Sequence, residues 1–165
     1  MNAKDKNGFK AESVCQLGVV VRDLDQVVKD WTEKFGFGPW SFLDSPSMRF
    51  ASVFVGPIQF ELMQPVEGEE QRGAGKLLLD YLDTWGDGVH HVAFCSDDVR
   101  ADAAGLVAQG VKQIADGGSD YAYFQSGGPK TTIFELMPRK TFKLIREKGL
   151  EGYARERMKQ AKTHE

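Results

Sequence analysis

The chain has 165 residues, of which 41% are hydrophobic and 27% charged, a composition ordinary for one globular domain. The formal net charge of -3 excludes the strongly basic surface that nucleic-acid-binding proteins carry. No apolar run approaches the roughly 20 residues that span a bilayer, and the polar first residues do not resemble a secretory signal. We therefore expect a cytoplasmic protein with neither a nucleic acid nor a membrane as its partner.

The predicted elements occur twice in the same order. In the first copy, residues 14–22 alternate as a strand, and apolar residues from Leu24 to Phe35 follow helical spacing. Three short strands follow at 40–43, 48–55 and 58–64. In the second copy, a strand at 89–95 leads to a helix with Val99 and Ala103 on its apolar face, and strands follow near 111–114, 121–125 and 131–137. A short helix at 76–82 is predicted between the copies, and a charged helix at about 140–160 follows them.

A repeated tetrapeptide, Phe-Glu-Leu-Met, supports the duplication. It occurs at residues 60–63 and 134–137, an offset of 74 residues. The same offset, within one residue, aligns further pairs: Asp23 with Asp98, Gly36 with Gly110, and Phe50 with Phe124. An offset that holds along the whole chain indicates two copies of one structural module.

These patterns predict an α+β fold in which two tandem βαβββ modules form one curved mixed sheet around a cleft. We expect a flexible N-terminal segment at 1–12 and a single domain at 13–138, with modules at about 13–65 and 88–138. A charged helical tail should follow at 139–165.

Strand alternation divides each predicted strand between two faces of the sheet. Apolar residues such as Leu17, Leu62 and Leu136 should face the helices. The opposite parity presents one potential metal ligand from each of four strands: Gln16, Glu61, His91 and Glu135. The first two are 45 residues apart and the last two 44, so a pseudo-twofold fold would bring all four to one concave surface.

A single strand glutamate is more often solvated on an exposed sheet face than bound to a metal. Two glutamates, a glutamine and a histidine at matched positions instead favour one divalent ion, for which Zn, Ni, Co, Mn, Fe and Mg all suit the donor set. Cys15 and Cys95 lack the spacing of a thiolate site. Four protein ligands leave octahedral positions open, so we predict a catalytic metal that binds a small-molecule carbonyl substrate.

The third strand of each copy supplies candidate substrate contacts. If Phe50 and Phe124 face the core, alternation turns three other residues toward the cleft: Arg49, Tyr123 and Gln125. Arg49 would suit a carboxylate or phosphate, although an ordinary surface arginine is the alternative. His90 has the parity opposite to His91, so we expect a core or edge residue rather than a ligand.

The sequence Gly-Val-His-His-Val-Ala-Phe at 88–94 and the two Phe-Glu-Leu-Met strands resemble the vicinal oxygen chelate superfamily, over about residues 14–138. That group includes glyoxalase I, methylmalonyl-CoA epimerase, fosfomycin-resistance enzymes and extradiol dioxygenases. The strand at 88–94 with Asp98 is most similar to the epimerases, whereas the Gln, Glu, His, Glu set resembles the ligands of glyoxalase I. The resemblance implies a homodimer and one divalent metal held by Gln16, Glu61, His91 and Glu135.

The activity that the resemblance implies is that of a metal-dependent isomerase, epimerase or lyase. Such an enzyme removes a proton next to a carbonyl and stabilises the resulting enediolate. Glu135 is the preferred base, and Glu61 is the candidate for the opposite face of the carbon. Two alternatives of the same fold stay open: an Fe(II)-dependent dioxygenase, and a non-catalytic small-molecule-binding protein of the resistance type.

Overall fold

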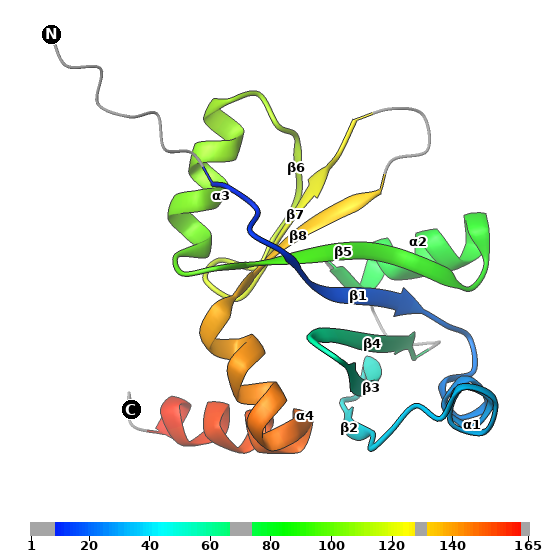
Figure 1. Cartoon of the computed structure of the whole chain (residues 1–165). Helices are drawn as coiled ribbons and strands as arrows, with labels where there is room; N and C mark the ends of the chain where they lie inside the picture. Colours follow the sequence, from blue (N-terminus) through cyan, green and yellow to red (C-terminus); the bar gives the residue numbers. More distant parts are fainter. Residues whose placement is uncertain (1–8, 67–73, 128–131, 163–165) are drawn as a thin grey trace, which may run out of the picture.

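Eight strands form a single mixed sheet in a computed structural model that describes residues 9–66, 74–127 and 132–162. The strand order is β2-β3-β4-β1-β5-β8-β7-β6, which is symmetric about the central β1–β5 pair (Figure 1). The predicted α+β fold of two tandem βαβββ modules is confirmed. Residues 1–8 of the predicted N-terminal segment and 163–165 of the predicted tail lie outside the described residues.

The two modules contain matching elements. The first contains β1 (Val14–Val20), α1 (Leu24–Phe35), β2 (Ser41–Asp44), β3 (Met48–Val55) and β4 (Ile58–Pro65). The second contains β5 (Gly88–Ser96), α3 (Val99–Ala108), β6 (Gln113–Asp116), β7 (Ala122–Gln125) and β8 (Ile133–Pro138). Helix α2 (Ala74–Trp85) connects the modules, and α4 (Arg139–Lys162) follows the second one.

The strand pairings place equivalent strands around a pseudo-twofold axis. β1 is parallel to β4, and β5 is parallel to β8, while β1 and β5 are antiparallel to each other. The strands that carry the four predicted metal ligands are therefore the four central strands of the sheet, as Figure 1 shows.

Aspartate caps start the helix of each module. The Asp23 carboxylate accepts a hydrogen bond from the Gln26 N–H at 2.9 Å, and Asp98 accepts one from the Ala101 N–H at 3.1 Å. Each aspartate satisfies a backbone donor that has no partner inside the first helical turn. Asp23 and Asp98, which the sequence offset aligns, are thus equivalent N-caps of the two modules.

Helices α1 and α3 cover the outer face of the sheet. Leu62 packs with α1 in one buried cluster, and Leu136 packs with α3 in another. Because side chains alternate along a strand, Glu61 and Glu135, the residues before these leucines, point toward the inner face. The packing of the two helices therefore fixes the direction of the two glutamates.

Helices α2 and α4 lie on the inner face. Leu78 and Leu82 of α2 pack with Val20 and Met63, while Phe142 of α4 packs near Met137. Helix α4 is kinked at position 149, where a glycine has φ 71° and ψ 178°, and Figure 1 shows the change of direction between its orange and red parts. In the part of the chain that the structure describes, no helix is long and apolar enough to cross a membrane.

Candidate active site

A cavity of about 330 Å³ lies at the inner face of the sheet. Gln16, Glu61 and Glu135 line it from β1, β4 and β8. Most of the remaining wall is apolar, with Leu78 supplied by α2 and Ile145 by α4. The cavity therefore combines both modules with the two helices of the inner face.

His91 is fully buried, with 0% of its surface exposed, and it lies opposite Gly18 in the β1–β5 register. A Cβ atom at position 18 would lie 2.1 Å from both Cε1 and Nε2 of the His91 ring. No side chain larger than hydrogen is compatible with that distance. Gly18 therefore leaves the space that the His91 imidazole fills.

Three of the four predicted ligands are in direct contact. His91 Nε2 lies 2.8 Å from Glu135 Oε2 and 3.3 Å from Gln16 Oε1. All three side chains are buried. An imidazole nitrogen, a carboxylate and an amide oxygen are thus gathered at one point, and a divalent ion binds donors of these types.

Glu61 faces the same cavity as Glu135. Burial, and then the negative charge of Glu135, raise the pKa of Glu61 from 4.5 to about 7, while His91 acts in the opposite direction. Glu61 can therefore both accept and release a proton near neutral pH, as a general base must. The repulsion between the two carboxylates would be relieved by a cation bound between them.

The types of donor atom that the four predicted ligands supply are suitable for a divalent cation. Among the described residues, no group of three or more histidine, cysteine, aspartate and glutamate side chains is arranged closely enough to hold an ion. The His91 imidazole is instead in contact with Glu135, and the carboxylate of Glu61 is destabilised by burial and by the Glu135 charge. The donors of Gln16, Glu61, His91 and Glu135 suit a divalent cation, so these are the residues that could hold one.

His90 lies beside His91, although simple alternation predicts opposite directions. The β1–β5 register shifts between Gly18 and Val19, which pair with His91 and Val89, so His90 is an extra residue in a β-bulge. Its Nδ1 lies 3.0 Å from the Nδ1 of His91. Burial, and then the proximity of His91, lower the pKa of His90 to about 3, which keeps its ring neutral. His90 therefore fixes the orientation of the His91 ring.

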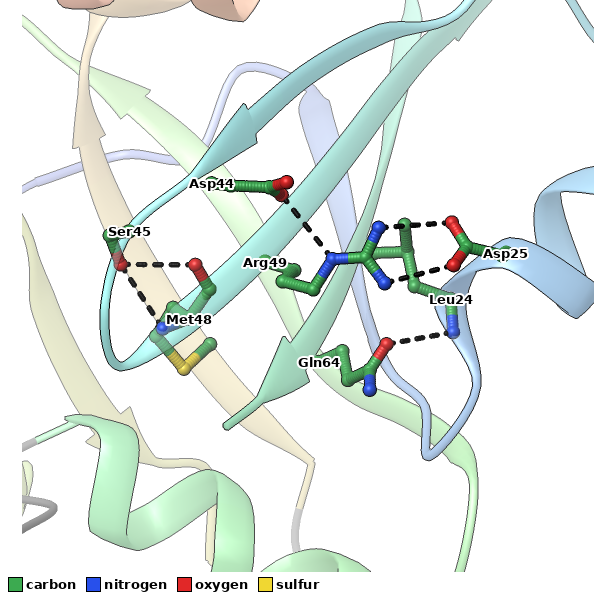
Figure 2. Close-up of polar contacts among 7 residues, drawn as sticks. All are labelled: Leu24, Asp25, Asp44, Ser45, Met48, Arg49 and Gln64. Atoms are coloured by element: carbon green, nitrogen blue, oxygen red, sulfur yellow. Dashed lines mark hydrogen bonds and ion pairs between the residues drawn. The ribbon is translucent and has the colours of Figure 1, made fainter. Parts of the chain in front are cut away.

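Arg49 is absent from the described lining of the cavity, so its predicted direction toward the cleft is wrong. Its guanidinium donates to both carboxylate oxygens of Asp25 at 3.0 Å and lies 3.5 Å from Asp44, as Figure 2 shows. Nearby, the Gln64 side chain accepts a hydrogen bond from the Leu24 N–H at 3.0 Å. Arg49 and Gln64 thus join β3 and β4 to the start of α1 on the outer face.

The different lengths of the β3–β4 and β7–β8 hairpins explain why Arg49 points away from the cavity. Glu61 pairs with Ser52, nine residues earlier in the chain. Glu135 pairs with Tyr123, twelve residues earlier. The structural equivalent of Tyr123 is therefore Ser52, and the constant offset fails by three residues on the third strand. An odd shift reverses the parity, so Phe50 lines the cavity.

Tyr123 lies where alternation predicts, in the lining of the cavity, with its ring centroid 5.1 Å from that of His91. Burial raises the pKa of the Tyr123 hydroxyl well above its ordinary value, so this group is a neutral hydrogen-bond donor. Gln125 lines a different hollow, together with His90 and Lys112. Tyr123 is thus placed to contact a substrate beside the glutamates, whereas Gln125 does not share their cavity.

Helix α4 contributes cavity residues that the sequence pattern did not reveal. Tyr153 and Arg157 line the cavity, together with Asp120 from the β6–β7 connection. The only sequence signal was the interruption of the tail helix by Gly149, which marks the kink but not the surface that the helix covers.

The structure therefore belongs to the class of proteins in which two βαβββ modules share one sheet around a cavity, here lined by two glutamates. The family model described as the glyoxalase/bleomycin resistance protein/dioxygenase superfamily matches residues 15–125. The chain therefore belongs to this superfamily. A comparison with proteins of curated function gave no significant match.

Solved structures share the fold. A methylmalonyl-CoA epimerase variant from Streptomyces coelicolor in complex with 2-nitronate-propionyl-CoA is 23% identical, with 78% of this chain and 98% of that chain covered and a TM-score of 0.64. The epimerase from Mycobacterium tuberculosis is 19% identical, with 81% and 93% covered and a TM-score of 0.59. A hypothetical protein from Bacillus halodurans is 16% identical, with 77% and 94% covered and a TM-score of 0.64. At these identities the likeness shows the fold.

Proposed function

We propose that the chain is a metal-dependent epimerase, isomerase or lyase that removes a proton from a carbon next to a carbonyl. The observation that carries this proposal is the pair of glutamates that line one cavity, of which Glu61 has its pKa raised to about 7. Solved epimerases of this fold in complex with methylmalonyl-CoA or 2-nitronate-propionyl-CoA support an acyl thioester as the first substrate class to test. A glyoxalase-type hemithioacetal is the second class.

The roles of the residues follow from their positions. One divalent ion held by Gln16, Glu61, His91 and Glu135 would polarise the substrate carbonyl and so lower the cost of proton removal. Glu135 takes the proton from one face of the carbon, and Glu61 serves the opposite face with its raised proton affinity. Tyr123 donates a hydrogen bond to the developing oxyanion.

The surroundings of the site support the same chemistry. The largely apolar wall excludes water, which strengthens the electrostatic interactions inside the cavity. Zn, Ni, Co, Mn, Fe and Mg all remain compatible with the oxygen-rich donor set. We further propose a cytoplasmic homodimer, which is supported by the resemblance to the superfamily alone.

Solvent-deuterium exchange tests the reaction. The protein is loaded with each metal in turn and incubated in D₂O with methylmalonyl-CoA or with the hemithioacetal of methylglyoxal and glutathione. Deuterium should enter the carbon next to the carbonyl, and metal analysis should find one bound ion per chain. Glu135→Gln and Glu61→Gln should each slow the exchange by at least about a hundredfold, the lower range for loss of a positioned base.

A matched control separates this effect from a general loss of charge. Glu33→Gln removes an exposed carboxylate on α1 and should leave the exchange rate unchanged. Failure to bind any divalent ion would favour a ligand-sequestering protein, and oxygen uptake with ferrous iron and a catechol would favour a dioxygenase. Either result, without exchange, would overturn the proposal.

A further inference from the structure

Helix α4 is a firmly attached wall of the cavity, although it lies outside the residues that the family model matches. Ile145 and Leu150 are buried, and the Leu150 N–H donates to Ser41 Oγ at 3.1 Å. The Glu151 carboxylate accepts a hydrogen bond from the Phe42 N–H at 3.0 Å. Leu150 and Glu151 directly follow the kink at position 149, so these contacts hold the start of the second half of α4 against β2.

This second half supplies Arg157, the one cation among the described residues that line the cavity. Its Nη1 lies 2.8 Å from Asp120 Oδ2 and 3.1 Å from the Tyr153 hydroxyl oxygen. Both contacts use Nη1, so within the described residues they leave the Nε–H and Nη2–H donors of the guanidinium without a partner. A planar guanidinium with one free edge can hold a carboxylate through two parallel hydrogen bonds.

Arg157 also lies between the cavity and a neighbouring groove. Four residues line both the cavity and an adjoining groove of about 630 Å³: Asp120, Thr141, Tyr153 and Arg157. The remaining cavity wall is largely apolar, so Arg157 is the group in it that attracts an anion.

We propose that Arg157 binds a carboxylate of the substrate and thereby selects acidic substrates. The choice of substrate rests on the function proposed above, whereas the binding of a carboxylate by Arg157 does not require it. Glu61 and Glu135 repel an anion, so the favourable place for the negative group is at Arg157. The Asp120 carboxylate competes for the same cation, because it is paired with the guanidinium at 2.8 Å.

Binding of hexanoate and hexanol by the full-length chain tests this inference. The two probes share an apolar chain that suits the cavity wall, and they differ in the carboxylate. Isothermal titration calorimetry is carried out with EDTA present and again with the activating metal. The chain should bind hexanoate in both conditions, and Arg157→Gln should weaken that binding about tenfold, as loss of a charge-assisted pair at a half-exposed site does. Hexanol binding should not change.

Two further variants separate carboxylate binding from a structural role. Arg155→Gln removes an exposed arginine of the same helix and should leave the affinity for hexanoate unchanged. Asp120→Asn removes the competing carboxylate and should strengthen hexanoate binding about threefold, in the range of exposed ion pairs. If the Asp120–Arg157 pair has only a structural role, both Asp120→Asn and Arg157→Gln should bind hexanoate more weakly.

The outcomes distinguish this inference from the proposed reaction. Arg157-dependent hexanoate binding without any deuterium exchange supports the carboxylate site and rejects the reaction. Deuterium exchange with equal hexanoate affinity in wild type and Arg157→Gln overturns the carboxylate site and keeps the reaction. Weaker hexanoate binding in Asp120→Asn also overturns it.

Discussion

Substitution of Gly18 by alanine gives a direct test of the predicted ligand role of His91. The added Cβ would lie 2.1 Å from Cε1 and Nε2 of the ring, whereas ordinary contact begins at 3.4 Å. The ring therefore has to move by about 1.3 Å, the difference between these two distances. That displacement breaks the geometry of the 2.8 Å contact with Glu135.

The ring has no space into which it can move without cost. His91 is fully buried, and the rings of His90 and Tyr123 lie with centroids 5.3 Å and 5.1 Å from its own. Overpacking of this kind destabilises a protein by about 1–3 kcal/mol. Loss of a residue that orients a metal ligand weakens metal binding about 10–100-fold. Displacement of the His91 ring itself should weaken metal binding at least as much.

Urea denaturation of the metal-free protein and calorimetric titration with a divalent metal measure the two effects. Gly105→Ala is the matched control, because a Cβ at this helical position meets no atom within 4 Å. It should stabilise the protein by about 0.5–1 kcal/mol and leave metal affinity unchanged. Unchanged stability of Gly18→Ala would refute the packing argument. Lower stability with full metal affinity would refute the ligand role of His91.

Three further predictions concern His90, Glu61 and Arg49. His90→Phe should lower metal affinity about 10–100-fold in calorimetric titration, because it removes the nitrogen that orients His91, and His90→Asn should recover part of the loss. The folded-state pKa of Glu61 is raised from 4.5 to about 7, so the folded metal-free protein binds this proton more tightly than the unfolded chain. Its free energy of unfolding should therefore fall as pH rises across that interval, and equal slopes in wild type and Glu61→Gln would contradict this. Arg49→Ala should lower the free energy of unfolding by less than about 1 kcal/mol and leave deuterium exchange intact; loss of exchange would restore a substrate role.

The duplication was predictable because its signals are local. A capping aspartate, a helix-ending glycine and an alternating strand depend on neighbouring residues, so Asp23 and Asp98 could be placed from the sequence. The directions of Glu61 and Glu135 were predictable for the same reason, because each is flanked by apolar residues that pack on the outer helices. These local signals were enough to predict the central strands of the sheet and the face on which each glutamate lies.

The features that could not be predicted depend on insertions and on tertiary packing. Three additional residues between Tyr123 and Glu135 reverse the parity of the third strand relative to the first module, and this reversal misplaced Arg49. One additional residue in β5 turns His90 toward His91. Alternation assumes that no residue is inserted, so it fails at a bulge. The surface that α4 covers is set by its contacts with β2, which its own sequence does not encode.

The two modules are equivalent in backbone but not in the partners of their glutamates. In the second module, Glu135 contacts the imidazole of His91, a group that can donate a hydrogen bond and carry positive charge. The equivalent position in the first module is Gln16, whose amide cannot be charged. Glu61 is thus left with burial and with repulsion from Glu135, and its pKa rises to about 7. A duplicated site has in this way acquired two carboxylates in different environments, one beside an imidazole and one beside an amide position.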